Sequence, residues 1–178
     1  MDITFITGNP AKAKYLSDYF KLPVAHHKLD LVEIQSLDLE EIARHKVEEA
    51  FRQLQKPVLV EDVSLSFDAL GELPGTLIKW FLTSLGNDGL CRLLEGYNNR
   101  SATASVVFAL HDGTDVHFFK GSTRGTIVGS PRGDKNFGWD PIFVPEGQTR
   151  TWAEMSPDEK HETSLRKPAL EQLAAFLS

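Results

Sequence analysis

The sequence predicts an α/β fold, because helical and extended patterns alternate along the chain. An apolar stretch at 2–7 is followed by a helical pattern at 10–20, and a second helical pattern at 38–55 leads into the apolar run Pro57–Val60. Between 103 and 128, short strand patterns are separated by turn residues. We therefore expect alternating strands and helices, with an antiparallel middle section.

The N-terminal strand is expected to end in a turn that opens the helix at 10–20. Asn9 is of a residue type that caps helices, and Pro10 suits the first helical position. Free backbone N–H groups at such an opening attract anions, and Thr7, Asn9 and Lys12 would add side-chain donors and a charge for a phosphate chain. Many helices that bind nothing also begin this way, so this segment alone is a weak signal.

The helix at 38–55 is supported by apolar residues at roughly helical spacing. The strand Pro57–Val60 then delivers Glu61 and Asp62 at its C-terminal end, where open α/β sheets commonly present ligand groups. Most acidic residues are solvated surface charges, and the position directly after an apolar strand favours a functional role for this pair.

The next helix is expected at about 76–85, with Gly86 at its end. Lys79 lies within an apolar run of this helix, where its ammonium must either reach solvent or meet an anion. Trp80 and Phe81 are expected to belong to the core.

Two strands at 103–110 and 115–120 are expected to form a hairpin around residues 111–114, followed by a further strand at 124–128. The C-terminal part is expected to be helical. Ser156-Pro157-Asp158-Glu159 has the pattern of a capping box with Pro at the first helical position.

A second C-terminal helix is expected to run to about Leu177. Pro168 disfavours one continuous helix, and Ser164 is suited to cap the second one. Lys160 and Arg166 would then lie close to the junction between the two helices.

The segment Phe137–Phe143 gathers three aromatic residues, a carboxylate and a glycine. A ring that stacks on a base, a carboxylate that accepts from N–H groups, and a glycine that permits close backbone approach would together form a nucleobase pocket. The alternative is a buried strand bounded by Pro141 and Pro145.

Together, these segments resemble the family of inosine triphosphate pyrophosphatases, which act on non-standard purine nucleoside triphosphates. The family opens with T-G-N-x-x-K and carries F-G-W-D-P in its last third. The matches follow one another along essentially the whole chain: Thr7, Gly8, Asn9 and Lys12; Leu31–Gln35 with Glu33; Lys46; Glu61 and Asp62; Pro74-Gly75 and Ile78–Phe81; Phe137–Pro141; and Ala153–Met155 with Lys160, Ser164 and Arg166.

The resemblance implies an elongated α/β fold of two lobes around a long twisted mixed sheet, with the active-site cleft between the lobes and usually a homodimer. It also implies Mg²⁺-dependent attack of water on the α-phosphorus, which releases a nucleoside monophosphate and pyrophosphate. One domain over 1–178 is the simplest count for a chain of this length.

The residue roles follow from this resemblance and from the charge of a triphosphate, whose oxygens must be neutralised before a nucleophile can approach. Glu33 and Asp62 are expected to hold Mg²⁺, and Asp62 also to orient or deprotonate the attacking water, with Glu61 able to share either role. Phe137 is expected to stack on the base, while Asp140 and backbone groups of Gly138 and Trp139 hydrogen-bond its edge. The remaining predicted substrate contacts are Thr7, Gly8, Asn9, Lys12, Lys46, Lys79, Lys160 and Arg166.

Two departures from the family pattern bear on activity. Leu165 stands where the family has a His that helps to contact the base, and Val63 stands where many relatives have a hydroxyl residue. They leave two alternatives open: a nucleotide-binding or regulatory protein with weak turnover, and a pyrophosphatase of altered base specificity.

Composition argues against several other classes of protein. A net charge of −6 argues against binding to nucleic acid polymers, which relies on many contacts from Lys and Arg to phosphates. Cys91 is the only cysteine, so no intrachain disulfide can form. No stretch approaches the roughly 20 apolar residues that a membrane span needs, and a cytoplasmic location is expected.

Overall fold

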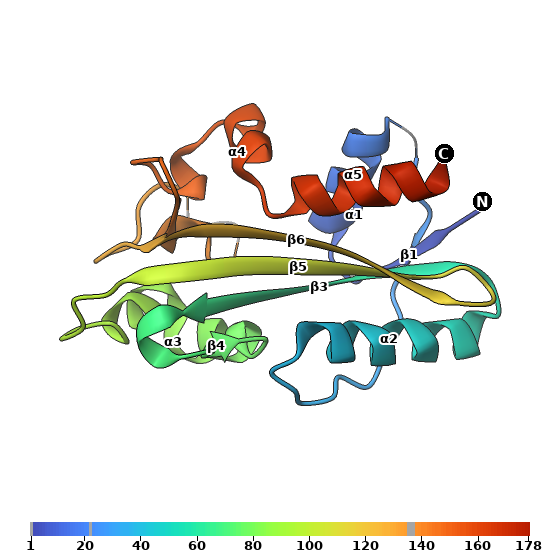
Figure 1. Ribbon diagram of the computed structural model, residues 1–178, viewed down its shortest axis with the longest axis horizontal. Coiled ribbons are helices and arrows are strands. Elements are labelled where there is room, and N and C mark those ends of the chain that lie inside the picture. Colours follow the sequence, from blue (N-terminus) through green and yellow to red (C-terminus); the bar gives the residue numbers. More distant parts are fainter. Residues whose placement is uncertain (1, 22, 135–137) are drawn as a thin grey trace. The chain divides into compact units, whose positions relative to one another are not determined.

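The computed structural model describes residues 2–21, 23–134 and 138–178. The strands are β1 (Thr4–Ile6), β2 (His26–His27), β3 (Val58–Phe67), β4 (Pro74–Gly75), β5 (Ser101–His111), β6 (Val116–Ile127) and β7 (Phe143–Pro145). The α-helices are α1 (Pro10–Phe20), α2 (Leu39–Leu54), α3 (Ile78–Arg92), α4 (Pro157–Thr163) and α5 (Arg166–Leu177). The expected α/β class is therefore confirmed (Figure 1).

Within the described residues, seven strands form one sheet in the order β2-β1-β3-β5-β6-β7, with β4 paired to β3. β1 runs parallel to β2 and β3, whereas the pairs β3–β4 and β6–β7 are antiparallel. The sheet is thus mixed, as the family resemblance implied.

The chain forms two compact units. Unit 1 contains residues 1–62, 107–120 and 172–178, and unit 2 contains 63–106 and 121–171. Strands β3, β5 and β6 each continue from one unit into the other. The count of a single domain over 1–178 stays a prediction.

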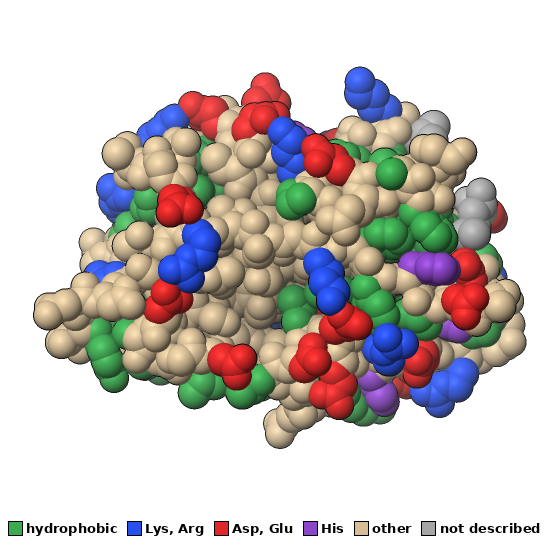
Figure 2. Space-filling view, viewed as in Figure 1, with side chains coloured by type: hydrophobic (Ala, Val, Ile, Leu, Met, Phe, Trp, Pro, Cys, Tyr) green, Lys and Arg blue, Asp and Glu red, His purple; other side chains and the backbone are tan. Residues whose placement is uncertain are grey.

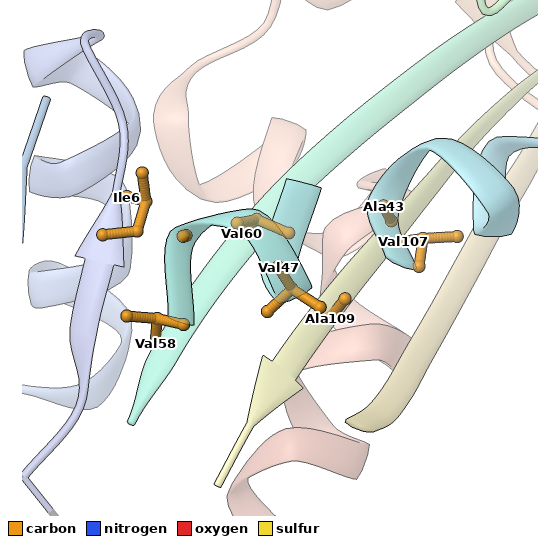
Figure 3. Packing of buried hydrophobic residues seen from close by; sticks show 8 residues of the cluster. Ile6, Ala43, Val47, Val58, Val60, Val107 and Ala109 are labelled. Carbon is orange, nitrogen blue, oxygen red and sulfur yellow. The ribbon is translucent and has the colours of Figure 1, made fainter. Parts of the chain in front are cut away.

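Helix α2 supplies one side of the core of unit 1. Asp38 caps the helix by accepting from the N–H groups of Glu40 and Glu41, which fixes where it begins. Its apolar face packs on the sheet, because residues three to four positions apart share one side of a helix (Figure 3). The buried cluster consists of Ile6, Ala43, Val47, Ala50, Val58, Val60, Val107 and Ala109. On the other face of the sheet lies α1, with Ala13 and Leu16 buried (Figure 1).

The core of unit 2 is rich in aromatic rings. The rings of Phe143 and Trp152 stack with centroids 4.4 Å apart, and the Trp139 ring lies 5.7 Å from Trp152. Trp152 also donates its ring N–H to the hydroxyl of Thr163 at 2.9 Å, which ties the last residue of α4 to this core. Such contacts hold α4 in place by both packing and a hydrogen bond.

Helix α3 begins at Ile78 and changes direction at Gly86, whose φ of 66° and ψ of 179° are not helical. The expected end of a helix at this glycine is confirmed, although helical residues resume and continue to Arg92. The expectation that Trp80 lies in the core is wrong, since its exposed fraction is 59%. Ile78 occupies the buried side, and a residue two positions later points about 200° away around the helix.

Two strand predictions also need correction. β3 does not stop at Val60 but continues to Phe67, where it pairs with β4. β6 is one strand rather than separate strands at 115–120 and 124–128. Within β6, a side chain at Gly121 would bring its Cβ to 2.0 Å from the Leu165 carbonyl oxygen. Glycine is needed in this strand because another backbone approaches it closely.

The C-terminal predictions are confirmed. Ser156 and Glu159 form the capping box of α4, and the Ser164 hydroxyl accepts from the N–H of Arg166 at 3.1 Å where α5 begins. None of the helices among the described residues has the length and apolar character needed to cross a bilayer.

Candidate active site

Unit 1 contains an acidic cluster, defined here as Lys12, Glu33, Lys46, Glu61 and Asp62. Lys46, on α2, donates to Asp62 Oδ1 at 2.8 Å and lies 3.5 Å from Glu33 Oε1. Lys12, on α1, lies 3.4 Å from Glu61 Oε1. The structure therefore brings together predicted residues from four separate segments of the sequence.

Glu61 and Asp62 lie within β3 and not at its C-terminal end, which corrects the sequence-based expectation. They nevertheless lie where the parallel pairing of β3 ends, which is a common place for ligand-binding residues. The parallel pairing with β1 reaches Leu59, and β1 itself ends at Ile6, so the two acids lie just beyond the parallel part of the sheet.

The two acids face different lysines because successive side chains of a strand point to opposite faces of the sheet. Asp62 meets Lys46 from α2, and Glu61 meets Lys12 from α1. Helices α1 and α2 lie on opposite faces of the sheet, as Figure 1 shows. Each of the two adjacent carboxylates thereby has a different lysine as its nearest partner.

Burial dominates the electrostatics of Asp62. It raises the pKa of the Asp62 carboxyl, and the ammonium groups of Lys46 and Lys12 oppose the shift without reversing it. For Lys46, burial acts to lower the pKa, but the carboxylates of Asp62 and Glu33 outweigh it and the pKa is raised. Lys46 is therefore firmly protonated at neutral pH.

Asp62 Oδ2 is buried and accepts no hydrogen bond from the described residues. A buried carboxylate oxygen without a partner is costly, by about 1–3 kcal/mol, and calls for a ligand that can use it. Oxygen ligands suit a hard divalent cation. No group of three or more candidate ligands occurs among the described side chains, so a cation there would rely on Asp62, Glu33, water and substrate oxygens.

The segment that opens α1 departs from expectation in one respect. The Asn9 N–H donates to Thr7 Oγ1 at 3.0 Å, and the Ala11 N–H donates to Asn9 Oδ1 at 3.0 Å. The Lys12 N–H also reaches the Asn9 carbonyl at 3.1 Å, so these backbone donors are not free for an anion. The Thr7 hydroxyl and the Asn9 amide act only as acceptors in these bonds and keep their own donor hydrogens.

Unit 2 contains a second group of predicted residues, the Asp140 cluster, defined here as Gly138, Trp139, Asp140 and Lys160. The Lys160 ammonium from α4 bonds to Asp140 Oδ2. Burial raises the pKa of the Asp140 carboxyl, and the charges of Lys160 and Arg166 oppose that rise. A buried acid held by a cation from another element is typical of a specific site and not of a solvated surface.

The structure also locates the other predicted residues of unit 2. Lys79 is exposed, with its ammonium 5.5 Å from the centroid of the Trp80 ring. Phe137 lies outside the described residues. Leu165, in place of the family His, is only 3% exposed and packs as a core residue.

One contact in unit 2 was not anticipated. The side-chain amide of Asn87 donates to the Gly138 carbonyl at 3.0 Å, across 51 positions of sequence. The available signal was an Asn directly after the predicted helix end at Gly86. That signal predicts a local cap and says nothing about a distant loop.

The surface carries both signs of charge. On the face that Figure 2 shows, acidic and basic side chains are interspersed and not gathered by sign. Binding of nucleic acid polymers would favour a continuous basic surface. That this chain does not bind them stays a prediction.

The fold and these clusters define an α/β protein whose buried carboxylates and lysines suit a phosphorylated ligand and a cation. Residues 3–176 match the Ham1 family, and the chain belongs to that family. An inosine triphosphate pyrophosphatase of Yarrowia lipolytica is 46% identical over 183 residues, covering 100% of this chain and 96% of the relative.

Solved structures agree in fold. A HAM1 protein from Coxiella burnetii aligns with a TM-score of 0.87 at 28% identity, covering 98% of this chain and 97% of the other. A nucleoside-triphosphatase, dITP/XTP pyrophosphatase, from Mycobacterium abscessus aligns with a TM-score of 0.78 at 29% identity, covering 99% of each chain.

Proposed function

We propose that this chain hydrolyses non-standard purine nucleoside triphosphates, namely ITP, dITP and XTP, to the nucleoside monophosphate and pyrophosphate. The family membership and the full-length similarity to an inosine triphosphate pyrophosphatase support this activity. The observation that carries the proposal is Asp62, buried beside Lys46 with one oxygen unpaired among the described residues.

In the proposed reaction, the acidic cluster handles the triphosphate. Glu33 and Asp62 would hold Mg²⁺, which when bound neutralises charge on the phosphate oxygens. Asp62 orients a water molecule and accepts its proton as the water oxygen bonds to the α-phosphorus. The bond between the α-phosphorus and the bridging oxygen breaks, and pyrophosphate leaves with that electron pair.

Lysines complete the proposed triphosphate site. Lys12 and Lys46 lie on helices that approach β3 from its two faces, so their ammonium groups can balance charge from different directions. Thr7 and Asn9 contribute donor hydrogens beside the start of α1. Gly8, Lys79 and Arg166 are proposed as further substrate contacts on the family resemblance.

The Asp140 cluster is proposed to bind the purine base. Asp140 and backbone groups of Gly138 and Trp139 would pair with a purine that carries a keto group at C6, while Phe137 stacks on its ring. An amino group at C6 would leave buried polar groups unpaired, at about 1–3 kcal/mol for each group. Adenine would thereby be rejected.

Product analysis tests the activity. The protein is incubated with Mg²⁺ and each of ITP, XTP, dITP, ATP, GTP and pyrimidine triphosphates, and pyrophosphate and orthophosphate are measured separately. We expect pyrophosphate from ITP, XTP and dITP. Release of orthophosphate would overturn the assigned bond, and binding without release would favour a regulatory role.

The relative rates for the different triphosphates test whether Leu165 changes the base specificity. A buried leucine contributes no polar contact to the purine edge, so preferential hydrolysis of another base would indicate an altered specificity. We also propose a homodimer from the family resemblance, which light scattering of the purified protein measures. The cytoplasmic location stays a prediction from the sequence.

A further inference from the structure

Asn87 is the first helical residue after Gly86, at which α3 leaves helical geometry, and it precedes the helical residues that end at Arg92. Here Asn87 Oδ1 is buried and accepts no hydrogen bond within the described ranges.

The Asn87 side chain instead bonds to a residue far away in the sequence. Asn87 Nδ2 donates to the Gly138 carbonyl oxygen at 3.0 Å. The residues after Gly138 are held by other means: the Trp139 ring packs beside Trp152, and Asp140 bonds to Lys160. Asn87 therefore restrains the carbonyl at which the Asp140 cluster begins.

A restraint on this carbonyl also orients the next N–H. The carbonyl of Gly138 and the N–H of Trp139 belong to one planar peptide group, in which they point in opposite directions. When Asn87 holds the oxygen on one side, the Trp139 N–H is directed to the other side. An N–H in a set direction suits a keto oxygen and disfavours an amino group, which has no acceptor to offer.

We propose that Asn87 is a positioning residue for base selection, which sets the peptide group between Gly138 and Trp139 so that its N–H meets the C6 keto group of the substrate. This inference rests on the proposed function. Asn87 lies on α3 and touches the base only through that peptide group.

Two substitutions break this hydrogen bond while they keep a short polar side chain at the position: Asn87→Asp and Asn87→Ser. The Asp side chain has no N–H to donate and places a carboxylate oxygen next to the Gly138 carbonyl oxygen. The Ser side chain is too short to reach that oxygen. Asn99→Asp is the matched control, because Asn99 Oδ1 accepts from the Ser101 N–H and the carboxylate keeps that bond.

The experiment measures kcat and KM for ITP and ATP with Mg²⁺, together with the melting temperature of each variant. Loss of this hydrogen bond is expected to lower the ratio of kcat/KM for ITP to that for ATP by about tenfold in both Asn87 variants. We expect the change mainly in KM for ITP, because the acidic cluster is untouched. Asn99→Asp should keep the wild-type ratio.

A ratio within about twofold of wild type in both Asn87 variants would overturn the inference while leaving the proposed function intact. Wild-type protein that releases no pyrophosphate from ITP would instead overturn the proposed function. If Asn87→Asp folds poorly, the neutral Asn87→Ser variant gives the decisive ratio.

Discussion

Asp62→Asn separates the stability of the acidic cluster from its proposed chemistry. The amide keeps an oxygen that accepts from Lys46 at the 2.8 Å position of Oδ1, but it removes the negative charge. Burial raises the pKa of Asp62, so the folded protein disfavours its charged form at neutral pH. The Asp62 charge also raises the pKa of Lys46, so its loss weakens the hold on that ammonium. Without a divalent ion, these two effects oppose each other, and the variant should stay close to the wild type in stability.

Mg²⁺ should make the wild type the more stable of the two. At a concentration one hundred times its dissociation constant, a ligand of the folded state adds about 2.7 kcal/mol to the free energy of unfolding. For a chain of this size, that corresponds to a rise in melting temperature of about 5–10 °C. If the variant binds the ion a hundredfold more weakly, the gain falls to about 0.4 kcal/mol, or about 1 °C.

Thermal unfolding with and without Mg²⁺ and pyrophosphate release from ITP measure these effects. Loss of a general base is expected to lower kcat by about 10²–10⁴-fold. Asp68→Asn is the control, since Asp68 forms an exposed ion pair with Arg124 at 2.8 Å and the substitution changes the charge equally. An Asp62→Asn variant with wild-type kcat, or with the same Mg²⁺ shift as wild type, would refute the reasoning.

Three further predictions concern unit 2. Lys160→Met should raise the pKa of Asp140 further, because the ammonium opposes the effect of burial, and the acid limb of kcat/KM for ITP should move to higher pH. Cys91 is 1% exposed and burial raises its pKa to about 11, so a thiol reagent should label it only upon unfolding; rapid labelling of folded protein would contradict this. Arg100→Met removes the guanidinium donors from four carbonyl oxygens, of which those of Cys91 and Leu94 still accept from backbone N–H groups. Denaturant unfolding should show a loss of about 2–4 kcal/mol with an unchanged ITP to ATP ratio. An unchanged midpoint would show that those bonds contribute little.

Local signals predicted the helices well. Asn9 and Pro10 mark the start of α1, the Ser156 capping box marks α4, and Ser164 precedes α5. Each signal acts within one turn, between residues that are neighbours in sequence. Such contacts form in much the same way whatever the rest of the chain does.

The sequence-based predictions are wrong where contacts between residues distant in the sequence determine the structure. The Leu165 carbonyl leaves no room for a side chain at Gly121 of β6, and the far end of β3 pairs with β4. Trp80 was assigned to the core from its apolar neighbours, although only the rotation of α3 decides which side chain is buried. No local pattern carries that information.

By itself, the sequence determined the α/β class, the starts of the helices that carry cap signals and the identity of most residues proposed for the site, because caps and ordered motifs are local features. Only the tertiary structure decided the partners: Lys46 with Asp62, Lys12 with Glu61, and Asn87 with Gly138. The first two pairs depend on which face of a strand a side chain takes and which helix covers that face, and the third joins a helix to a distant turn. Both are fixed by packing between segments far apart in the chain.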